Sequence, residues 1–293
     1  MSDVILSGGG HEVTLHGGDY EGPGLALTGL DGWYQTPDSN VTVTARGQGD
    51  GGHDISADDI LYEARCVTIG YRVLAGSNRS RALSELAKLD MLVHQTVTCR
   101  VIDDGQDTYC SGGYYVRSLD QRIQNPLWQN LTGDITIVFE RPERLSTKSH
   151  DGEARAATIQ SGGLSYGSVH AGLAYPLSYG VVSGGATLCR LPNDGTSRAY
   201  PTFMINGDWP SGVILYLNCE GRRTELRYDS AIHLGTPVLL DTRTRTATLG
   251  GVDVSRHLSS RGWRTIPAGK ALTVLLGTAG SGWVTCSSHD TYM

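Results

Sequence analysis

Glycine is the feature of this chain that most constrains its fold. The chain has 39 glycines among 293 residues, about 13%, against a usual share of ~7%. They fall between short runs rich in valine, threonine, isoleucine and tyrosine, and no Gly-X-Y period is present, which excludes a collagen-like helix. β-Branched and aromatic runs favour strands, and glycines between them favour tight turns. The pattern therefore predicts a chain of many short strands joined by turns.

Length and composition predict two folded domains. The chain is about twice the usual domain length of ~150 residues. Hydrophobic residues make up 39% and charged residues 18%, which is enough apolar material for packed cores and too little charge for a disordered chain. The net charge is -6 and the basic residues are dispersed, so neither nucleic acid nor an anionic membrane is an evident partner.

The start of the chain and its cysteines bear on where the protein is made. The first residues, Met-Ser-Asp-Val, have neither the charged nor the apolar region of a signal peptide, and no run approaches the ~18 apolar residues of a membrane span. No cysteine pair has the Cys-x-x-Cys spacing that is typical of zinc ligands. We therefore expect a soluble protein made in the cytoplasm, with free thiols when fresh. The six cysteines are Cys66, Cys99, Cys110, Cys189, Cys219 and Cys286.

The first half predicts a strand-rich domain with one helix. Leu83, Leu86 and Leu89 recur at helical spacing, and Asn78 precedes them as an N-cap candidate, so we expect a helix over about 79–92. Strands are expected on both sides of it. They cover residues 3–6, 13–16, 25–27, 41–44, 60–75, 95–101, 113–119 and 134–140.

A domain boundary is expected shortly after residue 140. The strand-like run there ends at Pro142, which cannot donate to a β-ladder, and residues 143–155 are polar without a period, as in a linker. We therefore expect domains over 1–145 and 146–293. The second half repeats strand-like runs at short intervals, which is typical of a β-sandwich. These runs are 201–205, 213–219, 224–228, 238–241, 246–249, 272–276 and 283–286.

Turn residues follow these runs in a definite order. Asp241 and Thr242 can close a turn through side chain to backbone hydrogen bonds, and Gly250 with Gly251 allows positive φ between paired strands. Trp263 is expected to plug one end of the sandwich. The order is Ala199-Tyr200-Pro201-Thr202-Phe203, Asn206-Gly207, strand 213–219, Glu220-Gly221, Gly235, Leu240-Asp241-Thr242, residues 246–252 and the Gly262-Trp263 to Pro267-Ala268-Gly269 segment.

This order resembles the C-terminal, galectin-like domain of the distal tail proteins of long-tailed (siphovirus) phages. The segment Thr28 to Tyr34 and the glycine-rich loop at 47–52 are similar to the early turn and loop of that family's N-terminal belt domain. The resemblance implies a mainly β fold. A split β-barrel with one helix, the belt domain, would occupy 1–145, and a galectin-like β-sandwich would occupy 146–293.

The resemblance also implies a role in tail assembly, with no reaction. It implies a hexameric ring at the distal end of the tail tube, connecting the tube to the baseplate or tip. Its partners would be other copies of itself, the tail tube protein, the tape measure protein, and the hub and receptor-binding proteins. DNA would pass through the ring without being bound, and no membrane would be entered. The protein would reside in the virion tail tip after synthesis in the host cytoplasm.

Several motifs in the sequence could bind a small ligand, but each fits a binding site poorly. Asp50, His53 and Asp54 lie in a glycine-rich loop, but the spacing of an EF-hand is missing, which favours a solvated loop. The glycines of 47–52 fit a dinucleotide fingerprint formally, yet they open no helix. His11 and His16 lack a helical His-x-x-x-His spacing. We predict no catalytic, cofactor-binding or metal-ligating residues, no cofactor, and no enzymatic activity.

A carbohydrate-binding tail protein that contacts the host surface is the alternative from a different class. A galectin-like sandwich can present a sugar site, and Trp209 or Trp283 could stack on a pyranose ring. Tryptophan in a sandwich is more often a core or interface residue. An exposed tryptophan flanked on one sheet by Asn, Arg or His would favour the sugar-binding alternative.

Overall fold

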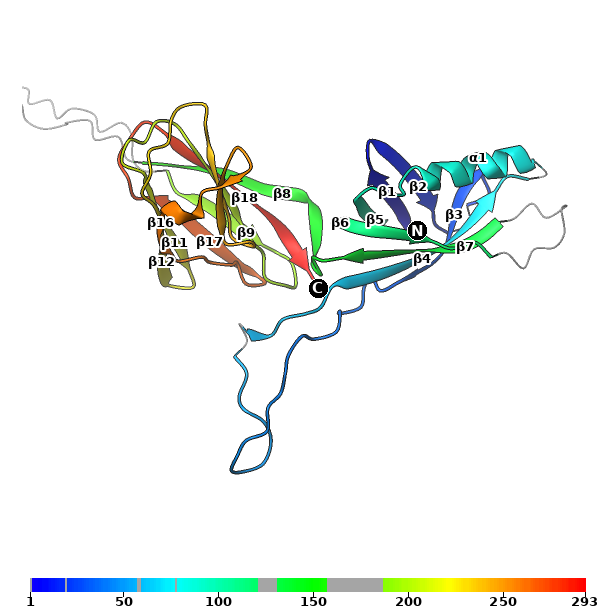
Figure 1. The fold of residues 1–293 in the computed structure, drawn as a ribbon, viewed down its shortest axis with the longest axis horizontal. Coiled ribbons are helices and arrows are strands. Elements are labelled where there is room, and N and C mark those ends of the chain that lie inside the picture. Colours follow the sequence, from blue (N-terminus) through cyan, green and yellow to red (C-terminus); the bar gives the residue numbers. More distant parts are fainter. Residues whose placement is uncertain (1, 19, 57–58, 77, 121–130, 157–186) are drawn as a thin grey trace, which may run out of the picture. The chain divides into compact units, whose positions relative to one another are not determined.

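The computed structural model describes residues 2–18, 20–56, 59–76, 78–120, 131–156 and 187–293. The chain divides into two compact units, 1–147 with 292–293, and 148–291. Strands dominate both units, and the described residues contain one α-helix (Figure 1). The prediction of a mainly β fold is therefore confirmed.

The first unit is a closed seven-stranded barrel. Its strand order is β6-β5-β1-β2-β3-β4-β7, and β7 pairs back onto β6. The β2–β3 pair is parallel and the other pairings around the barrel are antiparallel. The strands are β1 Asp3–Gly8, β2 His11–His16, β3 Gly24–Asp31, β4 Arg65–Leu74, β5 Val97–Asp103, β6 Gln106–Arg117 and β7 Leu131–Phe139.

Side chains alternate along these strands between the barrel core and the other face. In β4 the buried positions recur every second residue, and Val67, Ile69 and Val73 are completely buried, as the period of two requires. The strands predicted at 3–6 and 13–16 are present as β1 and β2, which form a hairpin with Gly9 and Gly10 at positive φ in its turn. The strand predicted at 41–44 is wrong, because these residues lie in the long connection from β3 to β4.

Helix α1, Arg79–Asp90, packs on the first unit, as the sequence predicted. Asn78 Oδ1 accepts a hydrogen bond from Arg81 N (3.1 Å) and caps the helix. The buried positions are Ala82, Leu86 and Leu89. Leu83, expected on the same stripe, is instead 50% exposed. At that turn of the helix Ala82 is the residue that packs into the core, and the next residue, Leu83, points toward solvent.

The second unit consists of two β-sheets that share one core. One sheet has the order β15-β14-β13-β10-β18-β8 and the other β16-β12-β11-β17-β9, and buried residues from both form a single cluster. This arrangement is the predicted sandwich. The strands are β8 Arg144–Arg155, β9 Cys189–Asn193, β10 Thr202–Asn206, β11 Val213–Cys219, β12 Arg222–Tyr228, β13 Val238–Asp241, β14 Thr246–Leu249, β15 Val252–Asp253, β16 Leu258–Arg261, β17 Lys270–Leu276 and β18 Trp283–Tyr292, with a 3-10 helix, η2, at Ser255–His257.

Predicted turns of the second unit form as expected. Asp241 Oδ1 accepts hydrogen bonds from Arg243 N (2.8 Å) and Thr244 N (3.4 Å), which closes the turn between β13 and β14. Gly250 and Gly251 have φ values of 56° and 84° between β14 and β15. Both turns are local, and their residues specify them directly.

Trp209, and not Trp263, is the fully buried tryptophan of the second unit. Its exposed fraction is 1%, and its Nε1 donates to Asn206 O (3.0 Å). Two glycines lie against its ring, since a Cβ at Gly280 or Gly282 would come within 2.5 Å of a ring carbon. Trp263 is half-buried at the edge of the same core. The expectation that Trp263 plugs the sandwich is therefore only partly met.

The segment expected to be a linker, 143–155, is a strand. Residues Arg144–Arg155 form β8, and its first residues pair with β6 through Thr108↔Ser146 and Tyr109↔Leu145. The division between the two units falls inside this strand, between residues 147 and 148. Its polar composition misled the prediction because most of its side chains after residue 146 are partly or fully exposed.

Candidate functional site

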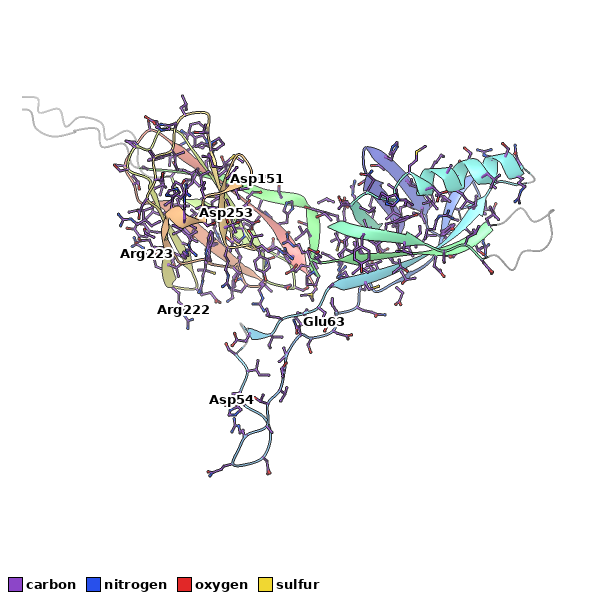
Figure 2. The ribbon with its side chains drawn as sticks, in the orientation of Figure 1. Asp54, Glu63, Asp151, Arg222, Arg223 and Asp253 are labelled. Carbon is purple, nitrogen blue, oxygen red and sulfur yellow. The ribbon has the colours of Figure 1, made fainter. Side chains whose placement is uncertain are left out.

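The most exposed feature of the first unit is a long arm between β3 and β4. We define the arm as residues 38–63. Its two limbs are joined by the bridges Ser39↔Tyr62 and Ala45↔Gly52. Figure 1 shows them running side by side, and Figure 2 labels Asp54 and Glu63 on them. The connection is far longer than the ~12–15 residues beyond which connections in compact domains are uncommon.

Apolar side chains of the arm lie open to solvent. The exposed fractions are 67% for Val43, 52% for Leu61 and 42% for Ile55. A charged pair, Arg46 Nη2 to Asp54 Oδ1 (2.8 Å), braces the tip. Apolar side chains on an extended, paired segment are typical of a surface that packs against another chain.

A buried arginine holds the base of the arm. Arg65, on β4, is 1% exposed. Its Nη1 donates to the carbonyls of Gly32, Trp33 and Gln35 at 2.7, 2.8 and 2.7 Å, and its Nε donates to Pro142 O at 2.6 Å. These bonds tie the start of the connection to β4 and to the segment before β8. Desolvation by burial lowers the pKa of this guanidinium.

A second buried arginine lies among aromatic rings. Arg144 is 6% exposed, and its guanidinium carbon is 5.9, 5.1 and 6.0 Å from the ring centres of Trp33, Tyr34 and Tyr292. Its Nε and Nη1 have no hydrogen-bond partner among the described residues. Burial lowers the pKa of Arg144, and cation–π attraction compensates part of its desolvation. The arginine therefore packs as a flat, charged core residue.

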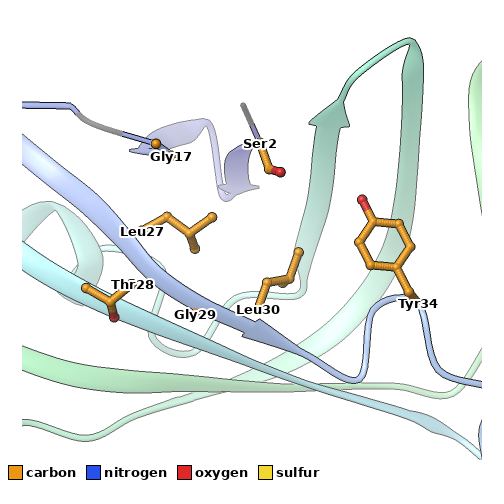
Figure 3. A pocket seen from close by; sticks show the side chains of 8 residues that line it. Ser2, Gly17, Leu27, Thr28, Gly29, Leu30 and Tyr34 are labelled. Atoms are coloured by element: carbon orange, nitrogen blue, oxygen red, sulfur yellow. The ribbon is translucent and has the colours of Figure 1, made fainter.

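A pocket of about 260 Å³ lies beside the arm's base (Figure 3). Its walls are apolar side chains, glycines and hydroxyl groups, and none of its lining residues carries an imidazole, thiol, carboxylate or amine. Ser2, Thr28 and Tyr34 bring hydroxyl groups to it, but no lining residue offers the imidazole, carboxylate or amine that would activate a hydroxyl as a nucleophile. The lining residues are Ser2, Gly17, Gly18, Leu27, Thr28, Gly29, Leu30 and Tyr34.

The residues considered for metal binding in the sequence do not come together. Asp54 pairs with Arg46, and His16 stacks on Tyr20 with ring centres 4.3 Å apart. Within the described ranges, neither Asp50 nor His53 belongs to a group of three potential ligand residues. One group of three potential ligand residues does occur among the described residues, in the second unit. No spacing in the sequence predicted it.

The two tryptophans considered for sugar binding are both covered. Trp209 lies in the core, so the suggestion that Trp209 stacks on a pyranose ring is wrong. Trp283 is half-buried, and the guanidinium of Arg155 lies 5.2 Å from its ring centre. The cation therefore occupies space over the Trp283 ring that a stacking pyranose would need on that face.

One sequence pattern runs against the expectation that the chain is no enzyme. Residues Gly163-Leu164-Ser165-Tyr166-Gly167 fit Gly-x-Ser-x-Gly, the pattern of a serine nucleophile on a strand–turn–helix elbow. The pentapeptide lies outside the described residues. Absence of activity stays a prediction.

The cysteines are free in this structure, with Cys66 exposed and the other five buried. Burial raises the pKa of Cys110 to about 12 and raises that of Cys99 well above its usual value, so both are poor nucleophiles at neutral pH. Among the described residues, none of the helices is long and apolar enough to cross a membrane.

The whole fold is similar to a solved phage protein. The chain matches no protein-family model and no curated protein sequence. It superposes on the crystal structure of the Dit protein of SPP1, described as a paradigm of the hub adsorption apparatus in Gram-positive infecting phages. The TM-score is 0.61, with 10% identity over 99% of each chain. At that identity the likeness shows a common fold across both units.

Two weaker matches are chains of the phage P2 baseplate in its activated conformation, one with Ca and one with Sr. Each has a TM-score of 0.46 and 11% identity, and covers 98% of each chain.

Proposed function

We propose that this chain is a structural protein of a phage tail, the distal tail protein that forms a hexameric ring at the end of the tail tube. One observation carries the proposal, the fold shared with SPP1 Dit over 99% of both chains. Both units take part in that match, so the proposal concerns the barrel and the sandwich alike. In this role the protein works by binding other proteins, without a reaction.

The arm supports the ring. A closed ring needs one surface that fits a different surface on the next copy. Val43, Leu61 and Ile55 offer apolar contacts along an extended segment, and Arg65 fixes the segment where it leaves the barrel. The arm of one copy would pack on the next copy in the ring, and the first unit would therefore form the ring.

The second unit would connect the ring to the tail tip. In this proposal 1–145 is the ring-forming belt domain and 146–293 the galectin-like domain. The ring would bind the tail tube and tape measure proteins on one side, and baseplate hub and receptor-binding proteins on the other. DNA would pass through the ring unbound. The protein would be made in the host cytoplasm and would remain in the virion at the tail tip, without entering a membrane.

Labelling of intact virions tests this placement. Gold-tagged antibodies against the second unit should decorate the tip of the tail in electron micrographs, and virions depleted of the chain should lack an organised tip. Antibodies against the tail tube serve as the control, since they should label along the tail. Label along the tube or on the capsid would contradict the proposal.

A further inference from the structure

Three potential metal ligands from distant parts of the sequence converge in the second unit. His150 lies on β8, Asp194 follows β9, and Asp290 lies on β18. One ligand atom of each lies within 4.8 Å of the others. The imidazole Nε2 of His150 is hydrogen-bonded to the carboxylate Oδ1 of Asp290 at 3.0 Å, a separation that two ligands on one ion can also adopt. Side chains brought together from three segments can enclose an ion from three directions.

The cluster is partly shielded from solvent. The side chains of His150 and Asp290 are 20% and 15% exposed, whereas Asp194 is exposed. Every second residue of β8 shares a face, and Ala154, on the same face as His150, belongs to the buried core. The three side chains therefore lie where the inner face of the sandwich meets solvent. That position lowers the cost of desolvating an ion while leaving it an entry path.

A buried asparagine holds the two carboxylates in place. Asn193 is completely buried; its Nδ2 donates to Ser197 O (2.7 Å) and Ile266 O (2.9 Å), and its Oδ1 accepts from Thr291 N (3.2 Å). The neighbouring backbone N–H, that of Asp194, donates to Asp290 Oδ1 at 2.7 Å. Asp194 follows Asn193 and Asp290 precedes Thr291, so these bonds hold both carboxylates in place. The cluster is therefore largely preorganised.

A buried hydroxyl supplies an independent sign of a missing ligand. Ser288 is 2% exposed, and its Oγ has no hydrogen-bond partner among the described residues. Leaving such a group unpaired costs about 1–3 kcal/mol. Ser288 precedes Asp290 by two residues on β18, so both point to the same face. A water bound to an ion at the cluster would give this hydroxyl its partner.

We propose that His150, Asp194 and Asp290 bind a divalent cation of the zinc class. A neutral imidazole with two carboxylates balances the charge of such an ion, and a nitrogen ligand favours Zn²⁺ over Ca²⁺ and Mg²⁺, which prefer oxygen alone. Three protein ligands leave a coordination position for water. The ion would clamp β8, β18 and the residue after β9, and would thereby stabilise the second unit.

The test is metal binding to the full chain after it has been stripped with a chelator. Calorimetric titration with ZnCl₂ should show one site per chain, and thermal unfolding should shift upward by several degrees. Co²⁺ should give visible d–d absorption at the same stoichiometry. CaCl₂ and MgCl₂ at equal concentration should produce a smaller shift. An equal or larger shift with CaCl₂ would overturn the assignment of the metal.

Variants locate the ion. Asp194→Asn changes an exposed side chain and should weaken zinc binding by at least about tenfold, as should His150→Gln. His289→Gln and Asp151→Asn, which alter the neighbours of these residues on the opposite face (Figure 2 labels Asp151 on the ribbon), should bind zinc normally, and so should Cys66→Ser. The stripped chain failing to bind zinc, or Asp194→Asn binding it as tightly as the native chain, would overturn the site.

Discussion

Each unit fixes an exposed segment with one buried polar side chain, but the two side chains differ in charge. Arg65 donates to four backbone carbonyls at the base of the arm. Asn193, in the second unit, bonds backbone donors and acceptors around Asp194. A cation costs far more to bury than an amide. The stability of the first unit should therefore depend more heavily on Arg65 than that of the second unit depends on Asn193. Substitution of either residue tests this difference.

Substitution of Arg65 should have the largest effect on stability. Arg65→Met keeps the volume but leaves buried carbonyls without donors, so we expect a loss of about 3–5 kcal/mol in the free energy of unfolding. Urea denaturation measures it. Arg144→Met is the matched control: its Nε and Nη1 lack partners, so its loss should stay below about 1 kcal/mol. Equal losses for the two variants would remove the distinction between an anchoring and a packing arginine.

Substitution of Asn193 should rank second. Asn193→Leu keeps a similar volume and removes the donors to Ser197 and Ile266 together with the acceptor for Thr291. We expect a loss of about 2–4 kcal/mol from the unpaired buried groups. Urea denaturation measures this loss, and calorimetric titration with ZnCl₂ should show weaker zinc binding by the same variant. A loss larger than that of Arg65→Met would reverse the comparison.

Packing around Trp209 predicts an intermediate effect confined to the second unit. In Gly282→Ala the new Cβ would lie 2.4 Å from Asn206 O and 2.5 Å from the indole ring, so the core must shift at a cost of about 1–3 kcal/mol. Unfolding followed by tryptophan fluorescence measures it. Gly29→Ala is the control, because a Cβ there meets nothing within 4 Å, and it should reduce stability less than Gly282→Ala does. Gly221 is unsuitable as a control because its φ of 75° would strain alanine.

The smallest effect is expected at an exposed ion pair of the first unit. Arg100 donates to both carboxylate oxygens of Asp107 (2.8 and 2.6 Å), which lowers the pKa of Asp107. The stabilisation is present above the pKa of the unfolded chain and is lost as pH falls through the lowered value. Since both side chains are more than a third exposed, Asp107→Asn should cost under about 1 kcal/mol at pH 7. The difference from the native chain should vanish near pH 2.

The sequence predicted those elements whose formation depends on neighbouring residues. Strands such as 213–219 and 238–241 and the turn at Asp241 were predicted with correct bounds, because alternation and turn residues act within a few positions. Strand β8 was missed because its polar composition resembles a linker, although pairing partners far along the chain make it a strand.

The candidate sites could not be predicted in the same way. The carbonyls that Arg65 binds belong to residues 30 to 77 positions away, and the ligands His150, Asp194 and Asp290 come from three separate strands or turns. No spacing rule joins such residues. Within the arm the sequence predicted a strand at 41–44, a glycine-rich loop at 47–52 and the start of a strand at 60. It did not predict the pairing between the limbs, because this pairing depends on the barrel strands that bring their ends together.

Shortening the arm separates stability from assembly. Replacing residues 40–61 with Asn-Gly joins the limbs at the Ser39↔Tyr62 bridge, and the change in unfolding free energy should stay within about 1 kcal/mol because loop entropy varies slowly with length. The double variant Val43→Ser, Leu61→Ser tests the apolar contacts alone. Leu234→Ser, at an exposed leucine of the second unit, is the control that should assemble normally.

The mass of the assembled protein in solution shows whether the chain forms a ring. Six copies would weigh about 188 kDa, six times the chain mass of 31.4 kDa. Light scattering of the concentrated, purified chain should give this mass, and electron micrographs of the same sample should show six-fold rings with an open centre. The variant with the shortened arm should remain monomeric, at the mass of a single shortened chain. A native chain that stays monomeric at high concentration, with no six-fold ring at the tip of intact tails, would contradict the account.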